Sequence, residues 1–247
     1  MPTPKASVII PAAGAGKRFA EAAASLHPGA VQPPSKAFAL LAGRPVLVHT
    51  LERFAAVQAV VEIVVAVAAD KVDWARQAFG DCLKGAKRLV VVAGGRDRTE
   101  SVAHALAATD GGTELVAIHD AVRPLIRPAI IEEALRVAIE HGAAVVGRLV
   151  DHTIKAVGPD RRVLRTVPRD ALWLAQTPQV FRREIIVHAY QRRENLVGYV
   201  TDDAQLVEAM GQAVVMVPGD TVNIKITAPE DLRACEALLA AGWPFET

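Results

Sequence analysis

Apolar residues along the chain gather in short continuous runs, and these runs alternate with segments of helical periodicity. Val8-Ile9-Ile10 is β-branched throughout, which is typical of a strand buried on both faces. Further strands are predicted at 62–69, 88–93, 115–118, 143–150 and 213–217, with a last short one at 223–226. Helices are predicted at 45–55, 70–79, 99–108, 130–140, 183–191 and 201–210, followed by a terminal helix. This alternation predicts an α/β fold, Rossmann-like, with a doubly wound and mostly parallel sheet.

Two helix starts carry recognisable capping residues. Asp70 stands where it would cap the second helix, and Thr227-Ala228-Pro229-Glu230 has the form of a capping box for the terminal helix. One apolar stretch is not expected to form a regular element. Residues 173–181 contain Gln176-Thr177-Pro178-Gln179, which is polar and interrupted by a proline.

The pattern changes at Asp151. Residues 153–157 and 163–167 alternate between apolar and polar, and Gly158-Pro159-Asp160-Arg161-Arg162 joins them, which predicts a β-hairpin. A two-stranded ribbon is marginally stable alone. It therefore either packs on a second copy of the chain or folds back on its own sheet. We expect one domain over 1–247, with 151–170 as a protruding arm.

A glycine-containing loop follows the first strand and runs Pro11-Ala12-Ala13-Gly14-Ala15-Gly16-Lys17-Arg18-Phe19. Consecutive N–H groups in such a loop can form a concavity that binds anions, with Lys17 and Arg18 as charge partners. A Walker A loop is excluded because Pro11 and Arg18 occupy its first glycine and its hydroxyl position. A dinucleotide-binding loop is disfavoured because Phe19 replaces the third glycine. A tight turn without a ligand stays open.

Composition limits the partners. Among 247 residues 51% are apolar, and 28 basic against 27 acidic side chains leave a net charge of +1, which indicates neither a nucleic-acid surface nor a polybasic membrane anchor. We see no membrane span and no signal peptide. Cys82 and Cys235 lack the spacing of metal or redox sites, so we expect reduced thiols in a cytoplasmic protein.

The least ordinary peptides follow predicted strands. Besides the loop after the first strand, Gly94-Gly95 follows the third, and His119-Asp120-Ala121-Val122-Arg123-Pro124 follows the fourth. The carboxyl ends of parallel strands meet at one edge of a sheet, where ligands of doubly wound folds bind. The sequence therefore predicts a ligand site at this edge.

Taken with Lys36, Thr177-Pro178-Gln179, Thr201-Asp202-Asp203 and Asn223-Ile224-Lys225, these motifs resemble 2-C-methyl-D-erythritol 4-phosphate cytidylyltransferases of the non-mevalonate isoprenoid pathway over nearly the whole chain. The resemblance implies a fold like that of nucleotide-diphospho-sugar transferases and transfer of CMP from CTP to methylerythritol phosphate, with release of pyrophosphate. It further implies Mg²⁺ or another divalent cation as cofactor. It also implies a homodimer joined through the arm.

The resemblance assigns the nucleotide to the three motifs at the sheet edge. Its implied contacts are Ala12, Ala13, Gly14, Gly16, Gly95, Arg96 (chiefly by its backbone), Ser101, Asp120 and Ala121. Among them, Gly95, Arg96 and Ser101 would hold the cytosine. Residues 94–102 fit the family pattern Gly-Gly-x-x-Arg-x-x-Ser-Val. Lys36 would reach the α-phosphate, Arg18 would stabilise the transition state, and Asp120 would lie near Mg²⁺ or a ribose hydroxyl. Simpler roles stay open: a surface position for Lys36, a helix-start serine at Ser101, and an Asp120–Arg123 ion pair that only shapes its loop.

The second substrate would be held by hydroxyls and cations, which suit a polyol phosphate. The implied residues are Arg123, Thr153, Arg169, Thr177, Thr201 and Lys225, of which Arg169 and Lys225 also count as catalytic. Thr153 and Arg169, at the base of the hairpin, would serve the neighbour's site. Thr201 could equally cap a helix. Because the attacking phosphate is already an anion, catalysis would rest on positioning and electrostatics without a general base.

Other functions stay in competition. A ribitol-5-phosphate cytidylyltransferase would share the CTP half of the site. A module that binds CTP without turnover would not need both Arg18 and Lys36, and a nicotinamide oxidoreductase would need the missing third glycine. The chain also departs from the family pattern: the segment between Arg18 and Lys36 is longer than usual, and Ala37 stands where glutamine is common.

Overall fold

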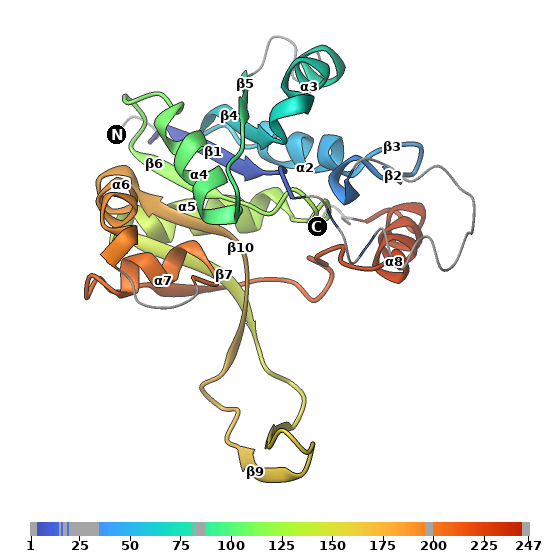
Figure 1. Cartoon of the computed structure of the whole chain (residues 1–247), viewed down its shortest axis with the longest axis vertical. Helices are drawn as coiled ribbons and strands as arrows, with labels where there is room; N and C mark the ends of the chain where they lie inside the picture. Colours follow the sequence, from blue (N-terminus) through green and yellow to red (C-terminus); the bar gives the residue numbers. More distant parts are fainter. Residues whose placement is uncertain are drawn as a thin grey trace.

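A seven-stranded sheet lies at the centre of the molecule, in the strand order β11-β7-β10-β6-β1-β4-β5 (Figure 1). The structure is a computed structural model that describes residues 4–14, 16, 19, 35–80, 82, 87–195 and 200–243. The strands are β1 (Ala6–Pro11), β4 (Val60–Val67), β5 (Arg88–Ala93), β6 (Leu115–Ile118), β7 (Ala143–Leu149), β10 (Trp173–Arg182) and β11 (Val215–Pro218). All neighbours pair in parallel except β10, which is antiparallel to β6 and β7. The predicted mostly parallel α/β fold is confirmed.

Helices cover both faces of the sheet because successive residues of its buried strands point to opposite sides. Val8 and Ile10 of β1 pack into one apolar cluster, and Ile9 packs into the other. The first cluster includes residues of α2 (Val46–Ala55), α3 (Val72–Phe79), α5 (Pro128–His141) and α8 (Pro229–Ala240). The second includes residues of α4 (Arg98–Ala107), α6 (Arg183–Gln191) and α7 (Asp203–Glu208). This double layer is what a continuous apolar strand requires.

Smaller elements join these units. They are the short strands β2 (Leu40–Leu41) and β3 (Arg44–Pro45) and the 3-10 turns η1 (Lys36–Phe38), η2 (Ala69–Lys71) and η3 (Arg193–Asn195). Within the described ranges no helix is both long and apolar enough to cross a membrane.

The prediction that 173–181 forms no element is wrong, because β10 runs through it. Its register with β7 shifts between Ala175 and Gln179, which accommodates the proline. The polar side chains are buried but satisfied. Gln176 donates to the carbonyl of Asp220 at 2.8 Å, and Gln179 donates to Asp202 at 2.8 Å. The polar sequence suggested an exposed loop, but the side chains of Gln176 and Gln179 form hydrogen bonds to Asp220 and Asp202, in loops beside the cavities, and not to water.

Three smaller predictions are also wrong. Residues 223–226 form no strand; instead Ile226 donates a single backbone hydrogen bond to Val122 at 2.9 Å. Asp70 lies inside η2, and Lys71 precedes α3 without a side-chain cap. The terminal helix starts one residue later than expected, after Ala228, and the carboxylate of Asp231 accepts the Ala228 N–H at 2.8 Å.

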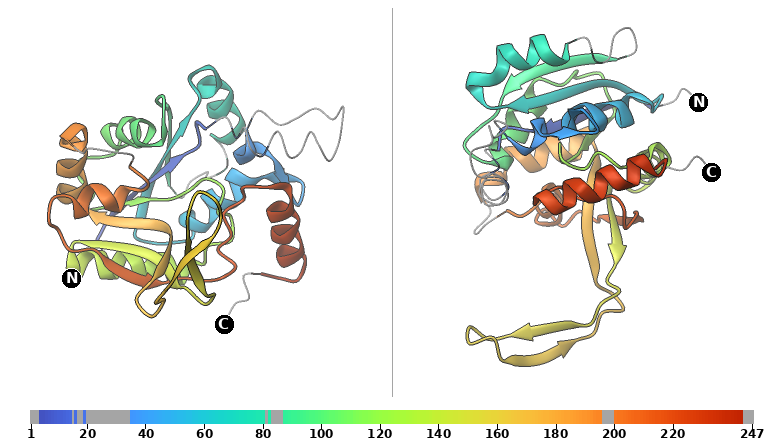
Figure 2. Two further views of the ribbon diagram at one scale, coloured as in Figure 1. Left: turned by 60° about the horizontal axis from the view of Figure 1, so that its bottom comes forward. Right: turned by 90° about the vertical axis from the view of Figure 1, so that its right-hand side faces the viewer.

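The predicted hairpin is confirmed as β8 (Ile154–Val157) paired with β9 (Val163–Val167). The arm, residues 151–170, projects from the body beyond the ends of β7 and β10 (Figures 1 and 2). The alternative in which the hairpin folds back on its own sheet is therefore wrong. Apolar side chains on the arm are exposed, and Leu164 retains 69% of its accessible surface.

Candidate active site

A cavity of about 390 Å³ lies beyond the carboxyl ends of β1, β5 and β6. It contains most of the residues to which the sequence assigned the nucleotide. The ones that line it are Ala12, Ala13, Gly14, Lys36, Gly95, Arg96, Ser101, Asp120 and Ala121. The structure therefore brings these residues together around one cavity at the predicted edge of the sheet. The proposed transition-state cation, Arg18, and its neighbour Lys17 lie outside the described residues.

Glycine is required at two positions that contact residues lining the cavity. Gly16 has a φ of +63°, and a Cβ there would lie 3.2 Å from the backbone nitrogen of Lys36. A Cβ at Gly94 would lie 2.4 Å from that of Ala13. The glycine loop can therefore approach both Lys36 and the end of β5 only because these side chains are missing.

Lys36 lies on the cavity wall at the start of η1, next to the beginning of α8. Burial alone would raise the pKa of Asp231, but hydrogen bonds from Thr227 and Ala228, together with the charge of Lys36, lower that pKa. This carboxylate therefore stays ionised beside Lys36. A purely solvated surface role for Lys36 does not describe this position.

Ser101 shapes the turn that was assigned to cytosine. Its hydroxyl accepts the Gly95 N–H at 3.0 Å and donates to the carbonyl of Asp97 at 2.7 Å. Asp97 in turn caps α4 by accepting the Glu100 N–H at 2.7 Å. The Arg96 N–H, expected to face the base, donates to Glu100 at 2.7 Å. In this structure Ser101 therefore has the helix-start role while lying in the cavity.

Asp120 is the centre of the site's electrostatics. One of its carboxylate oxygens lies 2.9 Å from Lys225 Nζ and 3.2 Å from Arg123 Nε, and the other lies 3.6 Å from Arg98 Nε. Burial alone would raise the pKa of Asp120, but these three cations outweigh it and hold the pKa well below its usual range. The ion pair with Arg123 exists, but it is one of three.

A second cavity of about 230 Å³ lies beside the first. Arg98, Asp120 and Lys225 line both cavities. Four of the residues assigned to the second substrate line the smaller one: Arg123, Thr177, Thr201 and Lys225. Two ligands bound side by side would thus meet at a shared set of charges.

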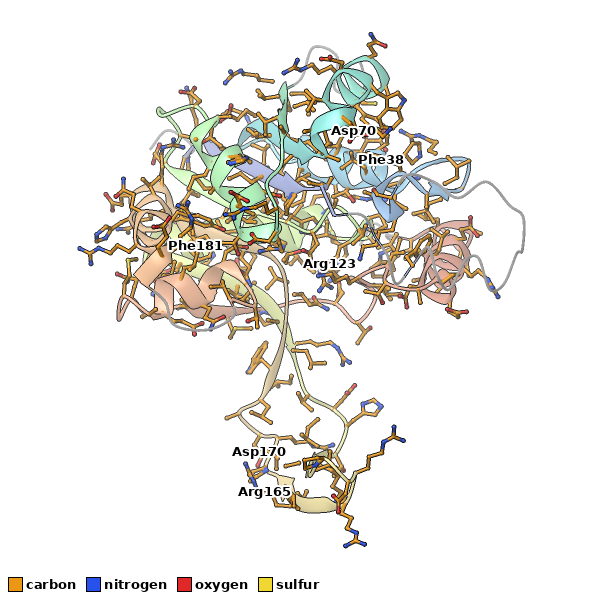
Figure 3. The ribbon with its side chains drawn as sticks, viewed as in Figure 1. Phe38, Asp70, Arg123, Arg165, Asp170 and Phe181 are labelled. Carbon is orange, nitrogen blue, oxygen red and sulfur yellow. The ribbon has the colours of Figure 1, made fainter. Side chains whose placement is uncertain are left out.

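Thr153 and Arg169 are not part of either cavity. Both are exposed on the arm, and Arg169 donates to the carbonyl of Asp151. Figure 3 shows Arg165 and Asp170, which lie on the same arm, far from Arg123 in the body (Figure 3). Within one chain, Thr153 and Arg169 therefore do not reach either cavity.

The Thr177 hydroxyl makes its hydrogen bonds within the protein, to the Asp120 backbone and to the His119 ring. Its Oγ1 accepts the Asp120 N–H at 3.1 Å and lies 3.0 Å from His119 Nδ1. His119 is buried, and burial lowers its pKa to about 4. The ring is therefore neutral near pH 7, with Nε2 donating to the carbonyl of Arg123 at 3.2 Å and Nδ1 accepting from Thr177. This pair fixes the backbone on both sides of Asp120.

The principal residue that sequence reasoning missed is Arg98. Its guanidinium donates to Asp203 at 2.7 Å and faces Asp120, so it bridges two carboxylates. Burial alone would lower the pKa of Arg98, but Asp203 and Asp120 raise it. The arginine of the Gly-Gly-x-x-Arg pattern was the available signal, because it places a cation in the first turn of the helix that follows β5.

The carboxylate that pairs with Arg98, that of Asp203, is held by residues of α6 and β10. Asp203 accepts a 2.5 Å hydrogen bond from the Tyr190 hydroxyl, and its N–H donates to Gln179 at 3.0 Å. The cap of α7 is Asp202, which accepts the Gln205 N–H at 3.0 Å. Thr201, the alternative cap, is therefore left at the mouth of the smaller cavity.

A divalent cation has one suitable carboxylate here. No group of three His, Cys, Asp or Glu side chains that could hold a metal occurs in the described ranges. The acidic residues lining the larger cavity are Asp97, which caps α4, and Asp120. Mg²⁺ is commonly bound by one or two carboxylates together with substrate phosphates, so Asp120 fits a metal that arrives with a nucleotide.

A doubly wound sheet with a glycine-loop cavity at its carboxyl edge, joined by shared cations to a second polar cavity, defines a nucleotidyltransferase. Residues 6–241 match the family model of IspD, 2-C-methyl-D-erythritol 4-phosphate cytidylyltransferase. The chain belongs to this family of enzymes.

Three similar proteins match the chain over nearly the whole length of both partners. The chain is 42% identical to the 2-C-methyl-D-erythritol 4-phosphate cytidylyltransferase of Solibacter usitatus, covering 95% of this chain and 96% of the relative. Among solved structures it resembles 4-diphosphocytidyl-2C-methyl-D-erythritol synthase from Anaerococcus prevotii, with a TM-score of 0.79, 29% identity and coverage of 96% and 99%. It also resembles 2-C-methyl-D-erythritol 4-phosphate cytidylyltransferase from Thermus thermophilus, with a TM-score of 0.72, 33% identity and coverage of 96% and 99%.

Proposed function

We propose that this protein transfers CMP from CTP to 2-C-methyl-D-erythritol 4-phosphate, giving 4-diphosphocytidyl-2-C-methyl-D-erythritol and pyrophosphate. The observation that carries the proposal is the junction of the two cavities at Arg98, Asp120 and Lys225. CTP occupies the larger cavity and the polyol phosphate the smaller one. A phosphate oxygen of the polyol phosphate attacks the α-phosphorus of CTP, and the bond from that phosphorus to the bridging oxygen of pyrophosphate breaks.

The site supports this reaction through charge. A phosphate monoester is largely a dianion at neutral pH, so the nucleophile needs no base. The main barrier is the approach of two anions, and Lys36, Lys225, Arg98 and Arg123 offer cations around it. Asp120 orients Lys225 and Arg123 by direct ion pairs. A Mg²⁺ held by Asp120 and the nucleotide phosphates would add charge neutralisation when bound.

We further propose a homodimer joined through the arm. The exposed apolar side chains on β8 and β9 and the marginal stability of an isolated hairpin support it. So does the position of Thr153 and Arg169, which lie away from the cavities of their own chain and would reach those of a neighbour. A cytoplasmic location and the absence of a nucleic-acid partner stay predictions from the sequence.

The experiment that tests the proposed reaction is pyrophosphate release by the purified protein with CTP and Mg²⁺. Methylerythritol phosphate and ribitol 5-phosphate are supplied separately. We expect release with the first and little with the second. Release with ribitol phosphate alone would instead identify the competing cytidylyltransferase, and CTP binding without release with either would indicate a binding module.

A further inference from the structure

Ser35 is a buried side chain of the larger cavity whose hydroxyl has no partner. Only 7% of its surface is exposed, and its Oγ makes no hydrogen bond within the part of the chain that the structure describes. It nevertheless lines the cavity, immediately before Lys36. A buried hydroxyl without a partner costs free energy, so such groups are rare and call for an explanation.

The local backbone does not use this hydroxyl. Ser35 precedes the η1 turn with an extended backbone, at φ −159° and ψ 162°, which is a position where serine usually caps the turn. Here its carbonyl closes the turn by accepting the Phe38 N–H at 3.0 Å, and the side chain makes no cap hydrogen bond. The backbone around η1 therefore leaves the Oγ–H unused, in a residue that lines the cavity.

The surroundings select the ligand group. Gly16, on the glycine loop, approaches the backbone of Lys36 so closely that a Cβ would lie 3.2 Å from its nitrogen. Ser35 therefore adjoins the side of the cavity formed by the glycine loop and Lys36. Gly95 and Ser101, which the resemblance assigns to the cytosine, lie in and after the turn that follows β5. Within a nucleotide, the oxygens that a lysine and the N–H groups of a glycine loop attract most strongly are those of the phosphates, because they carry the negative charge.

We propose that Ser35 Oγ donates a hydrogen bond to a triphosphate oxygen of the bound nucleotide, as a binding residue additional to those assigned above. This inference rests on the proposed function, because it takes CTP as the occupant of the larger cavity. It makes an unusual joint prediction: loss of the hydroxyl weakens nucleotide binding but does not destabilise the free protein.

The test compares Ser35→Ala with Ser7→Ala by calorimetric titration with CTP and Mg²⁺ and by thermal unfolding of the free protein. Ser7 is a matched control because it is also a buried serine, yet its hydroxyl lies 2.5 Å from Glu62 and 2.6 Å from Thr113, near the end of β1 that lies away from the cavity. For Ser35→Ala we expect about tenfold weaker CTP binding, equivalent to about 1.4 kcal/mol, and an unchanged or higher Tm. For Ser7→Ala we expect a lower Tm and unchanged CTP binding.

Three results would overturn the proposal. The first is CTP binding by Ser35→Ala equal to that of the wild type. The second is a lower Tm of the free Ser35→Ala protein, which would reveal a partner within the chain. The third is an equal loss of cytidine binding, which would place the contact on the nucleoside. If the wild-type protein binds no CTP, the proposed function is overturned as well. If the wild-type protein turns CTP over normally and one of these three results is found, only the role of Ser35 is overturned.

Discussion

Replacing Arg98 with methionine removes the guanidinium that bridges the carboxylates of Asp120, in the two cavities, and Asp203, in α7. The Asp203 carboxylate, only 1% exposed, loses a 2.7 Å ion pair and keeps the Tyr190 hydroxyl. Asp120 loses the longest of its three cationic partners, at 3.6 Å. Removing one member of a fully buried ion pair costs about 3–5 kcal/mol. Because the Arg98 side chain is 31% exposed, water compensates part of this cost, and we expect about 2 kcal/mol.

The assay is urea unfolding of Arg98→Met, Asp203→Asn and the double variant. In a parallel thermal unfolding experiment, a loss of about 2 kcal/mol corresponds at this chain length to a Tm lower by about 4–8 °C. The double variant should lose less than the sum of the two single losses, by about 1 kcal/mol, because each single change already breaks the pair. Arg136→Met is the control, since Arg136 pairs with Glu133 and Glu140 on the surface and should matter little. Additive losses, or equal losses of stability in Arg98→Met and Arg136→Met, would show that the Arg98–Asp203 pair does not stabilise the fold.

Further predictions concern charge, pH and assembly. Lys225→Met removes a cation shared by both cavities and should lower kcat/KM for CMP transfer roughly a hundredfold, whereas Lys71→Met, on an exposed pair with Asp70, should not. Burial lowers the pKa of His119 to about 4, whereas a histidine in the unfolded chain has a pKa of about 6.5. As the pH falls below about 6.5, the unfolded chain therefore binds a proton that the folded protein does not. The free energy of unfolding should drop by about 2 kcal/mol between about pH 7 and pH 5. Urea titrations of His119→Gln should lack this component, and a pH-independent wild type would contradict it. In light scattering, Leu164→Asp on the arm should convert dimers to monomers. Leu40→Asp, at a similarly exposed leucine of the body, should leave the dimer intact. A monomeric wild-type protein would contradict the role of the arm in dimerisation.

The order of strands and helices could be predicted because the buried strands are continuous apolar runs, as at Val8-Ile9-Ile10. The failure at β10 has a physical cause. Gln176, Thr177 and Gln179 are polar because they hold loops of the site, and a pattern of hydrophobicity has no means of separating such residues from solvated ones. Lys225 illustrates the converse: it lies on a loop where a strand was expected, yet it occupies the predicted site.

That Ala12, Ala13 and Gly95 would line one cavity could be predicted, because they follow parallel strands whose carboxyl ends meet at one edge of the sheet. Arg98 was missed because its partners, Asp120 and Asp203, are remote in sequence and come together only in the fold. Ser35 was missed for a different reason. Its hydroxyl is buried without a hydrogen-bond partner among the described residues, and a sequence does not show which buried groups lack partners.

The central claim is that two cavities sharing Arg98, Asp120 and Lys225 bind the two substrates side by side. A crystal structure with a non-hydrolysable CTP analogue and methylerythritol phosphate tests it most directly. We predict the nucleotide in the larger cavity, the polyol phosphate in the smaller one, and the attacking oxygen about 3–3.5 Å from the α-phosphorus, beside Lys225. A polyol phosphate bound away from Lys225 and Arg98, or a nucleotide outside the larger cavity, would contradict the claim.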